Sequence, residues 1–174
     1  MENKTLWAPW RIGYITDLDK GNKDCFLCHD LAHPEADDES HVLWRTDRCL
    51  VVLNRYPYNN GHTLIAPNRH VEDLSDLSDA ELLEMMKLVD NAKTCLQNCV
   101  QPHGYNVGIN LGRIAGAGLP GHLHTHIVPR WRGDTNFMSV CGGTDVISQS
   151  LVELLALLRE TSQKLGLPDL KVRD

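Results

Sequence analysis

The sequence contains little that would point to a membrane, to nucleic acid or to a repeat architecture. It has no apolar run of about 18 residues, and its first residues lead into no apolar run of signal-peptide length. Acidic side chains outnumber basic ones by 23 to 17, so the chain lacks the net basic surface that generic nucleic-acid binding needs. No repeat or low-complexity tract is visible. These absences favour a soluble, cytoplasmic protein without membrane or nucleic-acid partners.

The 174 residues are enough for one domain with a real core. We therefore expect a single domain over residues 1–174, with an aromatic N-terminal extension and a C-terminal helix. The extension, residues 5–16, carries Trp7, Trp10 and Tyr14. Six cysteines in a cytoplasmic protein are expected to be reduced or metal-bound rather than paired in disulfides.

The order of the predicted elements is mostly strands with two long helices. The first helix begins at Ser78, where Ser78-Asp79-Ala80-Glu81 has the form of a capping box, and its apolar face is expected to include Leu82, Met85 and Met86. A second amphipathic helix is predicted over residues 146–165. Strands are predicted at residues 42–44, 49–54, 62–66 and 105–111 and at the segment after residue 121. Short connections between these strands predict an α+β fold with a mainly antiparallel sheet.

The most informative stretch of the chain is residues 122–128, His-Leu-His-Thr-His-Ile-Val, with three histidines at strict alternation. Successive side chains of a strand point to opposite faces. His122, His124 and His126 are thus predicted to share one face, with adjacent imidazoles roughly 6.5 Å apart. Such a row can line a polyphosphate or crowd a metal. The plainer alternative is a polar strand face exposed to water.

Two flanking segments strengthen the first interpretation. Residues 112–118 are rich in glycine, and the free N–H groups of such a run can cradle phosphate oxygens, which makes Gly116 and Gly118 candidate nucleotide-binding residues. Residues 54–67 are dense in turn residues and lead into the strand that starts at His62.

With these flanks the chain resembles the histidine triad (HIT) family of nucleotidyl hydrolases and transferases. The resemblance covers most of residues 5–150. Its motifs are Trp-Ala-Pro-Trp-Arg at 7–11, Cys-Phe-Leu-Cys at 25–28, the 54–67 stretch, the 122–130 signature, and Gly-Asp-Thr-Asn-Phe-Met at 133–138. The outer segments are most similar to the bacterial branch related to diadenosine tetraphosphate phosphorylases. The resemblance implies a HIT-like fold, a homodimer, and cleavage of nucleoside phosphate anhydrides such as diadenosine tetraphosphate.

By this resemblance His124 is the nucleophile. A neutral imidazole can attack an α-phosphorus if a hydrogen bond orients its other nitrogen, and water or phosphate then resolves the nucleotidyl-histidine. His126 would donate to a non-bridging oxygen and stabilise the transition state. The family positions for ribose and phosphate contacts fall on Asn54 (ribose), and on His62, Asn110 and Gly118 (phosphates). For Asn54 and Asn110, ordinary turn chemistry is an equal alternative from the residues alone.

The loop at residues 117–121 departs from the family pattern, because it has no serine or glutamine near the leaving phosphate. Protonation of the leaving group would then fall to His122, His126, a backbone N–H or water.

The pair Cys25 and Cys28, followed by His29, allows three interpretations. A c-type haem attachment requires export, and a redox disulfide fits a thioredoxin-like context that is absent here. A structural zinc site needs two more ligands. Some family members supply them from positions that match His70 and His122, whereas His29, His33 and His41 lie close in sequence as competitors.

Two rival functions remain from the sequence. One is a metallohydrolase in which all three triad histidines bind zinc and activate water. The other is a nucleotide-binding sensor or interaction module with little turnover, which the missing loop side chain favours. Neither the triad nor its flanks decide between a phosphorylase and a hydrolase.

Overall fold

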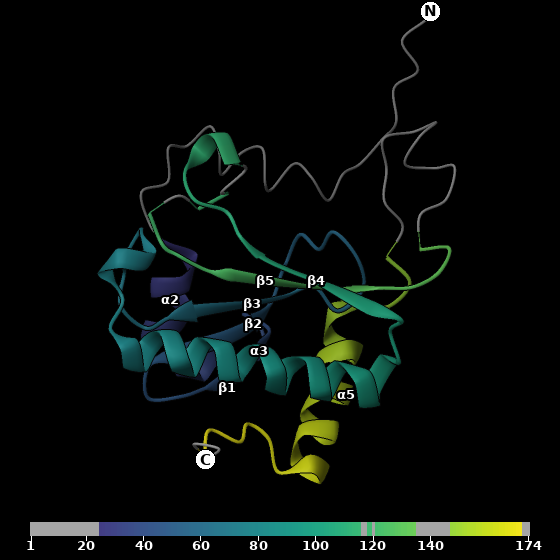
Figure 1. The fold of residues 1–174 in the computed structure, drawn as a ribbon. Coiled ribbons are helices and arrows are strands. Elements are labelled where there is room, and N and C mark those ends of the chain that lie inside the picture. Colours follow the sequence, from purple (N-terminus) through teal and green to yellow (C-terminus); the bar gives the residue numbers. More distant parts are fainter. Residues whose placement is uncertain (1–24, 116–117, 120, 135–146, 172–174) are drawn as a thin grey trace, which may run out of the picture.

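The chain folds into a five-stranded antiparallel sheet with helices on both faces (Figure 1). This computed structural model describes residues 25–115, 118–119, 121–134 and 147–171. The strands are β1 (Val42–Arg45), β2 (Cys49–Leu53), β3 (Thr63–Pro67), β4 (Gly104–Ile109) and β5 (Thr125–Arg130), in the order β1-β2-β3-β5-β4. All four pairings are antiparallel, which confirms the predicted α+β fold. The predicted N-terminal extension lies outside the described residues.

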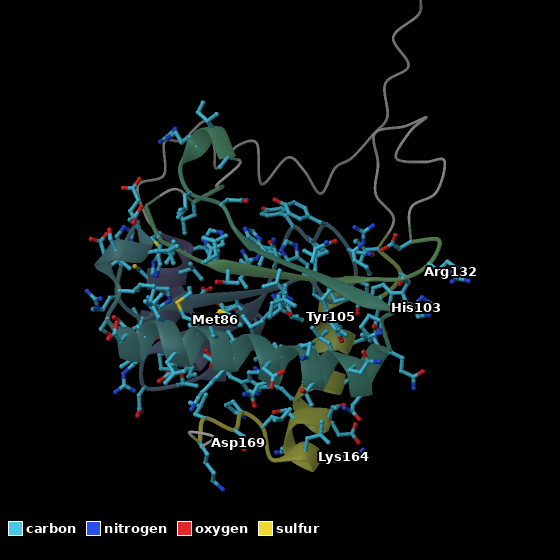
Figure 2. The ribbon with its side chains drawn as sticks, viewed as in Figure 1. Met86, His103, Tyr105, Arg132, Lys164 and Asp169 are labelled. Atoms are coloured by element: carbon cyan, nitrogen blue, oxygen red, sulfur yellow. The ribbon has the colours of Figure 1, made fainter. Side chains whose placement is uncertain are left out.

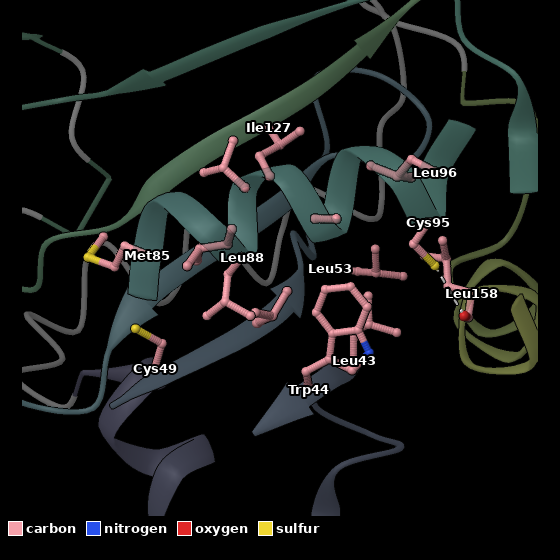
Figure 3. Close-up of a cluster of buried hydrophobic side chains, with 14 of the residues drawn as sticks. Leu43, Trp44, Cys49, Leu53, Met85, Leu88, Cys95, Leu96, Ile127 and Leu158 are labelled. Atoms are coloured by element: carbon pink, nitrogen blue, oxygen red, sulfur yellow. Dashed lines mark hydrogen bonds between the residues drawn. The ribbon is translucent and has the colours of Figure 1, made fainter. Parts of the chain in front are cut away.

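The central strand β2 is buried on both faces. Leu50 and Val52 pack toward the short helix α2 (Phe26–Ala32), whereas Val51 and Leu53 pack toward the long helix α3 (Asp79–Val100). Alternate side chains of a strand point to opposite faces, so a strand covered on both sides is apolar throughout. The larger of the two clusters also includes residues from β1, β5 and α5 (Leu151–Leu165), and Figure 3 shows part of it around α3.

The helix α3 begins where the capping box predicts. The Ser78 hydroxyl accepts from the Glu81 N–H, and the Glu81 carboxylate accepts from the Ser78 N–H at 2.8 Å. The predicted apolar face is wrong at Met86, which is 61% exposed on the outer surface of α3 (Figure 2), whereas Met85 is 3% exposed. Consecutive helical side chains point about 100° apart, so only one of two adjacent methionines faces the core.

The second long helix begins later than predicted. Residues 147–150 are not helical, and α5 starts at Leu151 behind Ser150, whose hydroxyl accepts from the Glu153 N–H at 3.2 Å. The apolar pattern begins several residues before Leu151, but the N-cap hydrogen bond sets the start of the helix. Ser-x-x-Glu at residues 150–153 was the signal that could have located it. None of the described helices is long and apolar enough to cross a membrane.

The short helix α2 was not predicted, and neither were the 3-10 turns η1 (Pro34–Ala36), η2 (Leu74–Asp76) and η3 (Arg113–Ala115). A helix of seven residues has too few turns to show a periodic apolar face. Its position comes from Leu27, which is fully buried against the sheet face opposite α3. This packing brings the N-terminus of α2, with its two cysteines, to the beginning of β5.

Candidate active site and metal centre

Two cysteines and two histidines converge at the N-terminus of α2. The ligand atoms of Cys25, Cys28, His70 and His122 all lie within 4.8 Å of one another. Cys25 is the N-cap of α2, Cys28 lies in its first turn, and His70 follows β3. The four residues come from three separate segments of the chain, and they are the set that the resemblance implied.

The distances in this cluster suit a metal site. The Sγ atom of Cys25 lies 3.1 Å from Nδ1 of His122, and the Sγ atom of Cys28 lies 3.2 Å from Nδ1 of His70. The carbonyl of Pro67 can only accept, so His122 donates its Nε2–H to it at 2.8 Å and keeps a lone pair on Nδ1, toward the sulfurs. A ligand histidine fixed by a carbonyl on its second nitrogen is the usual arrangement at zinc sites.

The backbone around the cluster leaves room for it. A Cβ added at Gly121 would lie 3.3 Å from Nε2 of His70, so glycine here allows the imidazole to approach. None of the predicted competitors, His29, His33 and His41, belongs to the cluster, and the rings of His29 and His33 stack on each other at 4.3 Å. Among the described residues, this is the one group of three or more potential ligands close enough to hold a metal ion.

The histidine triad does not form one equivalent row. Strand β5 begins at Thr125, so only His126 lies within it, and His122 and His124 belong to the segment that leads into the strand. The ring of His122 contacts His70 at 5.0 Å, while the rings of His124 and His126 contact each other at 4.8 Å. The predicted strand is thus wrong at His122 and His124, but the predicted alternation holds: Leu123 and Ile127 pack in the cluster under α3, whereas His122 lies against Cys25 on the opposite face.

His124 is oriented by its own backbone neighbour. Its Nδ1–H donates to the carbonyl of His122 at 2.8 Å, and this leaves the lone pair on Nε2. The residue is 8% exposed, and burial lowers the pKa of the imidazole. The side chain is thus neutral near pH 7 and carries a nucleophilic nitrogen with a defined orientation.

A chain of hydrogen bonds sets the tautomer of His126. The Tyr58 backbone N–H can only donate, so Nδ1 of His62 accepts from it at 3.1 Å and the proton of His62 is on Nε2. This Nε2–H donates to Nδ1 of His126 at 2.9 Å, which places the His126 proton on its own Nε2. That Nε2 is buried and has no hydrogen-bond partner among the described residues. The structure thus presents an unused N–H donor on a ring that contacts His124.

Burial keeps the two histidines of this hydrogen-bond chain, His62 and His126, uncharged; we call the pair the relay. Together with a smaller contribution from the neighbouring imidazoles, burial lowers the pKa of His62 to about 3 and that of His126 to about 4. Neutral rings are required here, because a protonated His62 would lose its acceptor nitrogen. We infer that the tautomers described above hold at neutral pH.

The other predicted nucleotide-binding residues have mixed positions. His62 is fully buried, and both of its ring nitrogens are engaged, one by the Tyr58 N–H and the other by His126. Asn54 accepts from the Tyr56 N–H at 2.9 Å, the turn chemistry that was its alternative, and its amide lies 3.2 Å from Nδ1 of His62. Asn110 directly follows β4, Gly118 is exposed, and Gly116 lies outside the described residues.

Two supporting groups were missed from the sequence. Pro67 holds His122 through its carbonyl, and Tyr58 holds His62 through its N–H. Backbone donors and acceptors leave no residue-type signal, so no sequence pattern could have indicated either contact.

Comparison with known proteins agrees with this geometry. Residues 35–133 match the family model described as HIT domain. The AP-4-A phosphorylase of Mycobacterium tuberculosis is 41% identical over 159 residues, which cover 88% of this chain and 81% of that protein. The asymmetrical bis(5'-nucleosyl)-tetraphosphatase of Schizosaccharomyces pombe is 34% identical over 95 residues, covering 55% of this chain and 52% of that protein.

A solved structure has the same fold. It is a Zn-bound histidine triad family protein from Mycobacterium smegmatis, with a TM-score of 0.64 at 25% identity, and the match covers 80% of this chain and 95% of that chain. The family match spans β1 to β5, and so it includes His62, His124 and His126. On the family match and the 41% identity over most of its length, this chain belongs to the HIT-domain family.

Proposed function

We propose that this protein cleaves the phosphoanhydride of dinucleoside polyphosphates, such as diadenosine tetraphosphate, through a nucleotidyl intermediate on His124. The observation that carries the proposal is the pair of prepared imidazoles: a lone pair on Nε2 of His124, and beside it a buried, unused N–H on His126. The similarity to an AP-4-A phosphorylase and to a tetraphosphatase supports the substrate class.

In the first step, Nε2 of His124 attacks the α-phosphorus, and the bond from this phosphorus to the bridging oxygen breaks. His124 needs to lose no proton, because its Nδ1–H stays on the His122 carbonyl and shares the positive charge of the phosphorylated ring. The Nε2–H of His126 stabilises the charge that develops on a non-bridging oxygen. The second step transfers the nucleotidyl group from His124 to phosphate or water and restores the neutral imidazole.

The departing polyphosphate has fewer proton donors than the sequence suggested. His122 donates Nε2–H to Pro67 and turns Nδ1 toward the thiols, so it has no proton to give. Of the two side chains named for this role, His126 remains.

The rival metallohydrolase does not fit this geometry. His122 faces two cysteines, and Nδ1 of His124 is already engaged by a carbonyl, so the three triad residues do not converge on one point. A low-turnover nucleotide sensor would have the same geometry, and the next experiment distinguishes it from the enzyme.

Product analysis of diadenosine tetraphosphate, with and without inorganic phosphate, tests the proposed function. We expect ADP and ATP when phosphate is present, because transfer of AMP from His124 to phosphate yields ADP and the leaving group is ATP. AMP and ATP, regardless of phosphate, would identify a hydrolase with the same intermediate. Tight AMP binding in calorimetry without release of any nucleotide would overturn the enzyme in favour of the sensor.

We further propose that the cluster of Cys25, Cys28, His70 and His122 binds a structural zinc ion. Two thiolates and two imidazoles are a common zinc ligand set, and the fixed Nε2 of His122 fits it. Bound zinc would tie α2 to the segment before β5. This role requires free thiols, which agrees with the predicted cytoplasmic location; that location and the single domain over residues 1–174 stay predictions.

We propose a homodimer that forms along β4. Within the described part of the chain β4 pairs only with β5, so its outer edge offers free backbone N–H and C=O groups to another strand. Apolar side chains are exposed along this edge and the segment after it: Val107 at 47%, Leu111 at 43% and Ile114 at 103%.

A charged substitution on the exposed edge of β4 tests the proposed dimer. We expect the wild type to sediment as a dimer at micromolar concentration and Val107→Glu to sediment as a monomer, because carboxylates facing each other across paired strands repel. Met86→Glu, which changes an equally exposed apolar residue on α3, should stay dimeric. A monomeric wild type, or a dimeric Val107→Glu variant, contradicts this proposal.

A further inference from the structure

The ring of Tyr58 lies against both histidines of the relay. Its centroid is 4.7 Å from that of His62 and 6.0 Å from that of His126, and the ring is within 19° of parallel to His126. Tyr58 itself is 57% exposed, whereas His62 is fully buried and His126 is half-buried. One side of the tyrosine ring therefore covers the histidine pair, and much of the rest is in contact with water.

We propose that Tyr58 is a positioning residue whose ring shields the His62–His126 hydrogen bond from water and so maintains the tautomer that presents the Nε2–H of His126. Its effect on catalysis rests on the proposed function, but its effect on the tautomers does not. Nothing in the motifs singled out Tyr58 for this role, because only the structure brings its ring onto the two imidazoles.

The physical reason is competition by water. A neutral imidazole can carry its proton on either nitrogen, so the relay holds only while each donor faces its intended acceptor. Water that reached the space between His62 and His126 would offer both a donor and an acceptor to either ring. Excluding it also lowers the local dielectric, which strengthens the 2.9 Å hydrogen bond between the two rings.

The ring of Tyr58 carries this role, and its hydroxyl does not. The phenol has no hydrogen-bond partner among the described residues. The contact with His62 that sets its tautomer comes from the Tyr58 backbone N–H, which every substitution except proline retains. Tyr58→Phe should therefore behave as the wild type, and Tyr58→Ala should expose the relay while keeping the backbone donor.

Long-range proton–nitrogen NMR of protein labelled with ¹⁵N-histidine tests the tautomers in the absence of substrate. In the wild type and Tyr58→Phe we expect His62 and His126 each to show a protonated Nε2 and an unprotonated Nδ1. In Tyr58→Ala we expect averaged signals from two tautomers in exchange. Tyr56→Ala removes a tyrosine from the same loop and should leave the spectrum unchanged. If Tyr58→Ala does not fold, Tyr58→Leu removes the aromatic face with less loss of volume.

Steady-state kinetics with diadenosine tetraphosphate supplies the second measurement. Loss of one preorganised donor lowers kcat by about 10²–10³-fold in other enzymes. Partial loss of the correct tautomer in Tyr58→Ala should therefore lower kcat by about 10-fold or more, with KM little changed and with full recovery in Tyr58→Phe. Unaltered histidine spectra in Tyr58→Ala overturn the proposal. Altered spectra in a protein without turnover in any form, wild type included, support the positioning role and reject the proposed function.

Discussion

Replacing His124 with alanine removes turnover of diadenosine tetraphosphate, by about 10⁴-fold or more, because the reaction loses the atom that forms the covalent bond. The variant keeps the Nε2–H of His126 and the other proposed phosphate contacts, so it should still bind nucleotide. Rapid quenching with a radiolabelled substrate should trap a labelled nucleotidyl-protein in the wild type and none in His124→Ala. The lost kcat with retained binding distinguishes a nucleophile from a residue that only contacts substrate.

The matched control is His103→Ala, which removes an exposed histidine just before β4 (Figure 2), at the end of the sheet where β4 pairs with Arg130. We expect it to retain wild-type turnover and wild-type labelling. Turnover in His124→Ala within 10-fold of the wild type would exclude covalent catalysis at this residue. Labelled protein that persists in His124→Ala would move the intermediate to another side chain.

Replacing Cys25 with alanine should remove the bound zinc and destabilise the fold. Loss of a supporting group outside the ligand shell already lowers metal affinity about 10–100-fold, so loss of a direct thiolate should cost about 100-fold or more. At saturating zinc a 100-fold loss of affinity removes about 2.7 kcal/mol from the free energy of unfolding. Metal analysis of the purified variant and thermal unfolding with and without a chelator measure both effects. The wild type should contain one zinc per chain and lose stability with the chelator, and the variant should respond to the chelator little or not at all.

Cys99→Ala is the matched control, because this thiol is on α3, away from the cluster. Its zinc content and its response to the chelator should equal those of the wild type. A wild type without zinc, together with unchanged unfolding of Cys25→Ala, would remove the metal site. The two sites also share a residue: the ring of His122 lies among the cysteines, and its carbonyl accepts from His124. Loss of the metal should therefore lower turnover as well as stability, while His124 itself stays intact.

Much of the site was accessible from the sequence because its chemistry depends on rare residue types at fixed spacing. The alternating histidines and the cysteine pair identified both the nucleophile candidate and the metal candidate, and the family resemblance linked His70 to the cysteines. The structure brings that predicted ligand set together within 4.8 Å. It also changes two expectations. Both ring nitrogens of His62 are engaged within the protein, and the Nε2–H of His122 is held by the Pro67 carbonyl.

The errors in the fold all come from the limits of apolar periodicity as a signal. Periodicity reports which side chains are apolar, but it does not report which of two apolar neighbours faces the core. Met86 shares the pattern of Met85 and yet is exposed, because α3 presents only one stripe to the sheet. At α5 the apolar pattern began before the true start of the helix, which the Ser150 hydroxyl sets by capping the first turn. The helix α2 was missed because seven residues carry no measurable period.

Local sequence is sufficient to establish the strand-rich α+β class, the antiparallel sheet and the residues able to perform the chemistry. These follow from alternation, capping and residue type, which act over a few neighbouring positions. The resemblance implied a different role for each of the three histidines, but the local pattern alone gives no physical reason for the difference. The tertiary structure supplies that reason by giving each histidine different partners: Pro67 and the cysteines for His122, His62 for His126, and the backbone of His122 for His124. An imidazole has two equivalent-looking nitrogens, and only the groups packed around it determine which one holds the proton.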